Sequence, residues 1–426
     1  MKKIFLQIGA TRDGQNPYCA VAKREGYFTV LAEMSDFIDY QSLSLELPFD
    51  LIVRLDRPEN PWEVMQAYLR AGLLEHPQVV LAGFEAYNAS AGRVREMLAG
   101  PDAGRCFIPL DKYAQRMALN KSCAGVPQPE FRFFASPLSI LAARDALLYP
   151  CVIKPVDGGG GLGIWLVATP QQLDQVVEKL VNTMNYGGRS FSGFIVECWL
   201  AGDEYSLQGV VHNGKALALT CCQKVIEQNC DSDGCISFYE SGHVAIAAEG
   251  LPAAFTRLMN LCCETFHYRQ GAFHIDFIVV NGVPHFLEMG FRLSGMGVVN
   301  LVQEVTDIDW AEVSFYIEAG LGLPPLRYAS EVRAVGQLRL RQPAQLALAQ
   351  AWIEQHQHGS LLPPLNQPSL PVTERSTLYA DLTRHAGILS TFRLAAAARD
   401  EVLMVFHHII HLQQPAALRR DMLCAE

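Results

Sequence analysis

A run of glycine between two short apolar segments places the strongest constraint on how this chain can fold. Residues 158–161 are four consecutive glycines and Gly163 is a fifth, while residues 151–153 and 164–167 are apolar and β-prone. The pattern predicts two strands joined by a glycine loop whose backbone N–H groups can approach an anion closely. Lys154, at the end of the first strand, would add a fixed positive charge there. A tight solvent-exposed hairpin is the alternative that the loop alone leaves open.

Composition and charge limit the class of protein. The chain has 426 residues, 50% hydrophobic and 18% charged, so it can bury several packed units and disorder is not expected. Its formal net charge of −10 argues against a nucleic-acid partner or an anionic membrane surface. No apolar run is long enough to span a bilayer, and residues 1–10 predict a first strand rather than a signal peptide. The 12 cysteines lack metal-like spacing, which predicts free thiols in a reducing cytoplasm.

The order of apolar segments predicts three units. Residues 1–110 alternate strand and helix, which predicts an α/β domain of Rossmann-like βαβ units with a parallel sheet. Residues 111–325 hold the glycine loop and several hairpins, with a small lid subdomain over about 122–191. Residues 326–426 predict a small α+β subdomain, in which the proline-rich stretch 361–371 is a connector.

Two apolar strands around residues 281–283 carry a pair of acids. A two-residue turn would place Asp276 opposite Leu287 and leave Glu288 on the other face. A three-residue loop would instead place Asp276 directly across from Glu288. Two opposed carboxylates in an apolar hairpin repel unless a cation joins them, and Mg²⁺ prefers a few carboxylates together with phosphate oxygens. The second register therefore predicts a magnesium site, and the apolar opposite face argues against two solvated acids.

Arg292 follows the second acid by four residues, and Gly295 lies just beyond it. A guanidinium beside a metal-bound phosphate can hold a transferring phosphoryl group or a substrate carboxylate. A structural salt bridge is the alternative, and the neighbouring acids favour the functional role.

Four blocks of this chain occur in the order seen in ATP-grasp ligases, and over roughly residues 110–310 the chain resembles that superfamily. The blocks are Asp111-Lys112, then Ile153-Lys154-Pro155 with the glycine loop, then Glu197 to Glu204, then Asp276 to Arg292. The resemblance implies an ATP-grasp fold of α/β and α+β units. Its parts would be an N-terminal Rossmann-like domain, a glycine-hairpin lid subdomain and a C-terminal α+β subdomain.

The resemblance also implies a role for individual residues. Arg292 would steady an acyl phosphate, with Lys154 as a second catalytic residue. Asp276 and Glu288 would bind Mg²⁺, or Mn²⁺ in its place. The ATP contacts would be shared among phosphate-binding residues (Lys112, Lys154, Gly159, Gly160 and Gly161), adenine-binding residues (Glu197 and the backbone near Leu200) and a ribose-binding acid, Glu204.

Within the superfamily, residues 205–215 and 239–243 look most like L-amino acid ligases, the dipeptide synthetase subgroup. This implies an ATP-dependent ligase that joins a small carboxylate to an amine and releases ADP, phosphate and a dipeptide or dipeptide-like amide. Neither a nucleic acid nor a membrane is expected as a partner. His243, His274 and Gly295 would border the acceptor pocket. A homodimer is a further expectation from the resemblance. Two alternatives stay open: a purine-pathway or carboxylating enzyme that uses formate or bicarbonate, and an ATP-binding protein without catalysis.

The chain departs from the family pattern at two positions. Gly290 stands where the family usually has Asn, two residues after the second metal acid, and the glycine loop lacks the usual serine. In the three-residue-loop register His274 opposes Gly290, so His274 or a water would fill the missing position, unless the histidine belongs to the core. Phosphate contact in the loop would then fall to backbone N–H groups alone.

Overall fold

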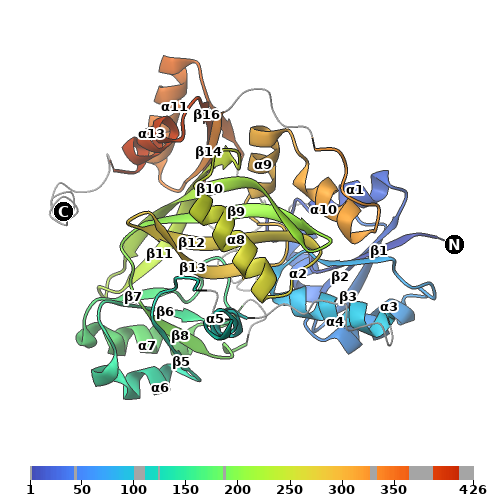
Figure 1. The fold of residues 1–426 in the computed structure, drawn as a ribbon, viewed down its shortest axis with the longest axis horizontal. Coiled ribbons are helices and arrows are strands. Elements are labelled where there is room, and N and C mark those ends of the chain that lie inside the picture. The colour runs from blue at the N-terminus through green and yellow to red at the C-terminus, as the bar shows by residue number, and fades with distance from the viewer. Residues whose placement is uncertain are drawn as a thin grey trace.

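A computed structural model describes residues 2–42, 46–99, 111–122, 125–185, 189–326, 333–363 and 387–411. Figure 1 shows a large central sheet with three regions around it: the N-terminal unit in blue, the strands and helices of residues 131–198 in green, and the C-terminal elements in orange and red. Among the described residues, no helix has the length and apolarity that a bilayer crossing requires.

The N-terminal region forms a parallel sheet of its own. Its four strands are β1 (Ile4–Ile8), β2 (Phe28–Met34), β3 (Leu51–Leu55) and β4 (Val79–Ala82), in the order β3-β2-β1-β4. The connecting helices are α1 (Pro17–Arg24), α2 (Ser35–Ser42), α3 (Pro61–Arg70), the 3-10 helix η1 (Glu85–Tyr87) and α4 (Asn88–Ala99). The predicted βαβ pattern of this region is confirmed, because apolar strands covered by helices on both faces favour parallel pairing.

The remaining described strands join a second, antiparallel sheet of 12 strands, whose main path runs β13-β12-β9-β10-β11-β7-β6-β8-β5. Strands β14, β15 and β16 attach to this path through β11. The bounds are β5 (Phe131–Phe134), β6 (Cys151–Pro155), β7 (Trp165–Val167), β8 (Phe194–Cys198), β9 (Asp203–His212), β10 (Lys215–Cys230), β11 (Ile236–Ala247), β12 (Gly271–Val280), β13 (Val283–Gly290), β14 (Ala334–Leu340), β15 (Ser360–Leu362) and β16 (Ser390–Ala396).

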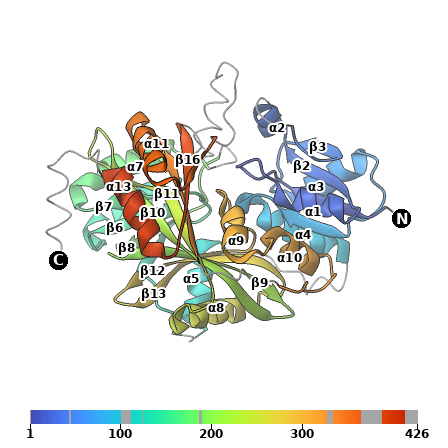
Figure 2. The ribbon, with the colours of Figure 1, turned by 90° about the horizontal axis from the view of Figure 1, so that it is seen from above.

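Helices cover this sheet and connect it to the N-terminal unit. They are α5 (Lys112–Lys121), α6 (Pro137–Ala142), α7 (Leu173–Asn182), α8 (Ala253–Thr265), α9 (Val298–Thr306), α10 (Trp310–Glu318), α11 (Pro343–His356) and α13 (Arg399–His411). Figure 2 shows α9 and α10 between the large sheet and the N-terminal unit. The ring of Phe315 in α10 packs edge-on against Phe5 and Tyr27, with centroids 5.4 and 5.3 Å apart. These aromatic contacts fix the N-terminal unit against the sheet and so position the space between them.

The glycine-rich segment folds as two antiparallel strands with a loop between them. Cys151 in β6 pairs with Val167 in β7, which confirms the predicted strand, loop and strand. Within the loop, Gly160, Gly161 and Gly163 have φ values of 57°, 78° and 71°. This left-handed backbone favours glycine, which explains why the segment holds so many.

The sequence underestimates the strands that follow. The sequence predicts only that residues 111–325 hold several hairpins, whereas β9 and β10 meet at the turn Asn213-Gly214, β10 runs as far as Cys230, and β11 pairs along it. Polar residues such as Lys224 and Glu240 interrupt the apolar pattern in these strands. They are tolerated because they pair with one another beneath the surface, a compensation that local patterning does not reveal.

The register between β12 and β13 combines features of both expected arrangements. Val280 pairs with Val283, so the turn has two residues and the expected three-residue loop is wrong. Asp276 nevertheless stands opposite Glu288, because a bulge after Asp276 leaves Leu287 as the extra residue of β13. A bulge commonly re-aims side chains in this way near functional sites.

The same register brings His274 opposite Gly290. A Cβ atom added to Gly290 would lie 2.1 Å from Cε1 of the His274 ring, closer than real contacts allow. The imidazole therefore fills the space that a side chain at position 290 would need. His274 Nδ1 also lies 3.3 Å from the carbonyl oxygen of Arg292, which links the ring to the following loop.

This packing predicts that Gly290→Ala destabilises the fold and that His274→Ala relieves the effect. We expect Gly290→Ala to lower the free energy of unfolding by about 1–3 kcal/mol, the usual cost of overpacking. Urea denaturation of the two single variants and the double variant gives the interaction energy. Additive losses, with no relief in the double variant, would show that the ring does not exclude the side chain.

Candidate active site

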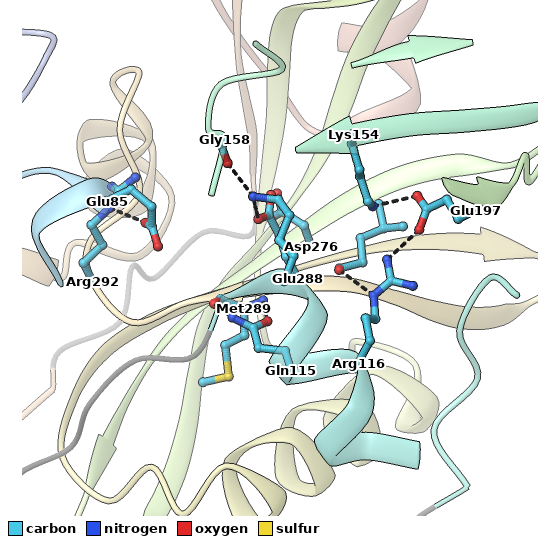
Figure 3. A network of polar contacts seen from close by, with 12 residues as sticks. Glu85, Gln115, Arg116, Lys154, Gly158, Glu197, Asp276, Glu288, Met289 and Arg292 are labelled. Carbon is cyan, nitrogen blue, oxygen red and sulfur yellow. Dashed lines mark hydrogen bonds and ion pairs between the residues drawn. The ribbon is translucent and has the colours of Figure 1, made fainter. Parts of the chain in front are cut away.

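Helix α5 directs three polar side chains toward β13. Its first turn is capped by Asp111, whose carboxylate accepts a hydrogen bond from the Ala114 backbone N–H at 2.8 Å. Lys112, Gln115 and Arg116 lie on one helical face and are all buried. The Gln115 amide exchanges two hydrogen bonds with the Met289 backbone, at 2.9 and 2.8 Å (Figure 3). This pairing holds the helix beside Glu288.

Each of the two opposed acids is paired with a lysine. Glu288 lies 2.6 Å from the Lys112 ammonium, which also donates to the Gly158 carbonyl oxygen at 2.5 Å. Asp276 accepts from Lys224 at 2.6 Å and from the Ser206 hydroxyl at 2.5 Å. Burial alone would raise the pKa of Glu288, but Lys112 outweighs it and lowers that pKa to about 2. Glu288 is therefore a carboxylate at neutral pH.

Lys224 is one of the charges that sequence reasoning missed. Its ammonium contacts Glu204 at 2.7 Å, Glu240 at 3.3 Å and Asp276 at 2.6 Å, and its side chain is only 8% exposed. Burial opposes the charged form, yet the three carboxylates keep the pKa of Lys224 well above its usual value. The available signal was a lysine within an otherwise alternating segment, which is uncommon unless the charge is paired.

A second buried cluster lies on the far side of the two acids (Figure 3). The Glu197 carboxylate accepts from Lys154 at 2.6 Å and from Arg116 at 2.9 Å, and all three side chains are buried. Burial would raise the pKa of Glu197, but the two cations lower it. Glu197 thus holds Lys154 in the wall of the site, and its contact with adenine stays a prediction.

Arg292 and Glu85 lie on the opposite side, where they form an ion pair at 2.6 Å (Figure 3). Glu85 belongs to η1 of the N-terminal unit, so the pair joins the two sheets. Sequence reasoning did not find Glu85, because its partner is 207 residues away.

Glu240 and His243 form another pair, with 3.0 Å between Glu240 Oε1 and His243 Nε2. Burial favours a higher pKa for Glu240, but His243 and Lys224 hold it well below the usual range. Burial lowers the pKa of His243. At neutral pH the pair is a carboxylate beside a neutral imidazole.

Two pockets open around these charges. The lid pocket is lined by β6, the segment from Glu197 to Glu204, β10 and α13, and it includes Lys154, Glu197, Leu200 and Glu204. The inter-sheet pocket lies between the N-terminal unit and the 12-stranded sheet, and it includes Gly159, Gly160, His243, His274, Arg292 and Gly295. Gly161, which was predicted to bind phosphate, does not line either of these two pockets. Lys112, Lys224, Asp276 and Glu288 line both, so the pockets meet at these four charges.

The two acids fit a hard divalent cation. Asp276 and Glu288 offer opposed oxygen donors, which suits Mg²⁺. In the part of the chain that the structure describes, no third His, Cys, Asp or Glu joins them in a metal-binding group, so His274 does not complete a cage. A cation here would take its remaining ligands from phosphate oxygens and water.

The buried triad around Glu197 generates a stability prediction. Arg116→Met should lower the free energy of unfolding by about 3–5 kcal/mol, because it removes one partner of a buried ion pair. Arg132→Met is the matched control, since Arg132 is exposed, donates to the Ala146 carbonyl oxygen and lies 5.3 Å from the centre of the Phe134 ring, with no buried acid as partner in the described contacts of its strand. Equal losses for the two variants in urea denaturation would contradict a special role for the triad.

Comparison with known proteins agrees with this geometry. Residues 110–296 match the protein family described as ATP-grasp domain. The chain is 26% identical over 201 residues to the formate-dependent phosphoribosylglycinamide formyltransferase of Pectobacterium carotovorum subsp. carotovorum (strain PC1), a match that covers 47% of each chain. It is 26% identical over 270 residues to the D-alanine–D-alanine ligase of Anaeromyxobacter dehalogenans (strain 2CP-C), covering 60% of this chain and 78% of that protein. The chain spans about half the length of the first of these relatives.

The fold extends the likeness beyond the matched domain. The L-amino acid ligase from Bacillus licheniformis superposes with a TM-score of 0.66 at 18% identity, covering 96% of this chain and 97% of that one. The domain match runs from α5 to the loop beyond β13 and contains every charged residue of the site described above except Glu85. Residues 110–296 therefore match the ATP-grasp domain family, and the likeness in fold extends over the rest of the described chain.

Proposed function

We propose that this protein is an ATP-dependent carboxylate–amine ligase that joins amino acids through an acyl phosphate. The observation that carries the proposal is the junction of two pockets at Lys112, Lys224, Asp276 and Glu288. A nucleotide in one pocket and an acid in the other would bring the terminal phosphate and the carboxylate together at the place where paired charges lie.

The lid pocket suits ATP. Val152, Ile164 and Leu287 offer apolar walls for a base, and Glu204 offers an oxygen acceptor for ribose hydroxyls. Lys154 lines the same pocket as Lys112 and Lys224, which supports a role for it in binding phosphate. The glycine loop closes over the junction, where Gly158 already contacts Lys112. Backbone N–H groups of that loop would then face the phosphates.

The junction supplies charges for phosphoryl transfer. Lys112 and Lys224 can exchange their carboxylate partners for phosphate oxygens when the polyphosphate arrives, and Asp276 and Glu288 are then free to hold Mg²⁺. Bound Mg²⁺ would neutralise negative charge on the phosphoryl group.

The reaction would follow in two steps. A substrate carboxylate oxygen attacks the terminal phosphorus, the bond to ADP breaks, and an acyl phosphate forms. An amine then attacks the acyl carbon, the carbon–oxygen bond breaks, and amide, phosphate and a proton are released. A closed loop would protect the acyl phosphate from water between the two steps.

Amino-acid substrates are supported by the charges of the inter-sheet pocket. Arg292 and Glu85 present a cation beside an anion, which complements the carboxylate and ammonium groups of an amino acid. Glu240 adds a further carboxylate to the lining of this pocket. The likeness to a D-alanine–D-alanine ligase points in the same direction.

A second candidate is an enzyme that activates formate or bicarbonate and transfers it to a nucleotide-like amine. The relative named as a formate-dependent formyltransferase favours it. Such an amine would carry phosphate into the inter-sheet pocket, where Arg12 is the cation from the N-terminal unit. Arg12 pairs with Glu33 at 2.7 Å and stacks on Phe37 and Phe84, so it would have to exchange its carboxylate partner for phosphate, as the junction lysines would.

The proposal is tested by phosphate release from Mg-ATP across a panel of amino acids, offered singly and in pairs. We expect release that needs a particular pair and yields a condensed product by mass. Glu288→Gln should reduce the rate by about two orders of magnitude or more, because it removes charge from the junction. Glu264→Gln, on the exposed face of α8, is the matched control and should leave the rate unchanged.

Other outcomes separate the alternatives. Release that needs formate or bicarbonate with a phosphorylated amine would establish the second candidate. Tight binding of Mg-ATP with no release under any substrate would indicate a nucleotide-binding protein without catalysis.

A further inference from the structure

Strand β14 of the C-terminal region carries two buried polar side chains to the back of the inter-sheet pocket. It pairs with β11 so that Gln337 stands opposite His243, and its other edge pairs with β16. Gln337 is 4% exposed and Arg339 is 5% exposed. Polar groups buried this deeply need partners, and their partners lie in the pocket wall.

Gln337 has a fixed orientation that determines how His243 is protonated. Its Nε2 donates to the Met296 carbonyl oxygen at 2.7 Å, and its Oε1 accepts from Arg393 at 3.1 Å. These two bonds leave the second Nε2–H facing His243 Nδ1, 3.4 Å away. Nδ1 is then an acceptor, so the imidazole proton is on Nε2 and points at Glu240.

Arg339 holds the same two pocket segments through their backbones. One guanidinium nitrogen donates to the Glu240 carbonyl oxygen at 2.7 Å, and another donates to the Met296 carbonyl oxygen at 3.2 Å. The guanidinium also lies 4.0 Å from Glu240 Oε1. A planar fork with several donors can hold two acceptors at once, which a lysine cannot do equally well.

The loop that receives these bonds has an unfavourable backbone. Met296 has a φ of 62° and Gly297 a φ of 77°. A left-handed conformation is unfavourable for a non-glycine residue, so it persists only where the surroundings hold it. Here two donors from β14 converge on the Met296 carbonyl oxygen. The Met296 side chain itself lines the inter-sheet pocket.

We propose that Gln337 and Arg339 are positioning residues for the amino-acid side of the reaction. They fix the Glu240–His243 pair and the Met296 loop, and they touch neither the lid pocket nor the junction of the two pockets. The C-terminal strands are thereby part of the active site rather than an appended unit. The inference rests on the proposed function, since it assigns the inter-sheet pocket to the amino acids.

The first test is a split between the KM values for amino acid and for ATP. Gln337→Leu and Arg339→Met should each raise the amino-acid KM by about tenfold or more, the effect of losing one hydrogen bond to a well-held group. The KM for ATP should stay unchanged. Arg339→Lys should recover part of the loss, because it retains the charge and some donors. Arg333→Gln, in the same region but bonded to the Glu304 carbonyl oxygen, is the matched control.

A purely structural role would shift both KM values together or lower the amount of folded protein without changing either KM. Either result would overturn the proposal, and so would an amino-acid KM that does not change in Gln337→Leu and Arg339→Met.

A second readout does not depend on activity. In protein labelled with ¹³C at the methionine methyl groups, the Met296 signal can be assigned from its loss in Met296→Leu. We expect this signal to shift and broaden in Gln337→Leu and to stay unchanged in Arg333→Gln. Absence of amino-acid-stimulated phosphate release in the wild type would contradict the proposed function alone, whereas an unchanged Met296 signal in Gln337→Leu would contradict this inference.

Discussion

The opposition of Asp276 and Glu288 is the constraint on which the rest of the site depends. Two carboxylates facing each other in a mostly buried hairpin repel, so neighbouring elements must supply positive charge. Lys112 arrives from α5 and Lys224 from β10, and each pairs with one acid at 2.6 Å. The negative charges of the two acids are therefore neutralised by the two lysines before any ligand enters. A polyphosphate and a divalent cation can then replace these pairs with new ones of the same kind, which lowers the reorganisation that binding requires.

Strand β11 explains why the parts of the chain act on a single site. It pairs with β10 in the central sheet, with β7 beside the glycine loop, and with β14 of the C-terminal region. It also carries Glu240 and His243 into the inter-sheet pocket. A displacement of β7 or β14 would therefore also displace β11, the strand that carries Glu240 and His243. Helix α10 adds the N-terminal unit to this arrangement through Phe315, so that Glu85 reaches Arg292.

Much of the fold and part of the site could be predicted from local sequence signals. Periodicity and turn residues indicated the N-terminal strands, and glycine density indicated the β6–β7 hairpin, because both depend on neighbours in the chain. The opposition of Asp276 and Glu288 was expected from a longer loop, but a bulge at Leu287 produces it. Glu85, Arg116 and Lys224 were missed since their charges are balanced by residues far away in sequence. The predicted connector at 361–371 lies largely outside the described residues.

The central claim is that a substrate carboxylate takes the terminal phosphoryl group of ATP at the junction of the two pockets. The most direct measurement is the transfer of ¹⁸O from a carboxyl-labelled amino acid to inorganic phosphate, followed by mass spectrometry during turnover. An acyl phosphate requires that each phosphate released carry one oxygen from the carboxylate, so we expect labelled phosphate in proportion to product. Product formed together with unlabelled phosphate would contradict the account, because the carboxylate would then have been activated in another way.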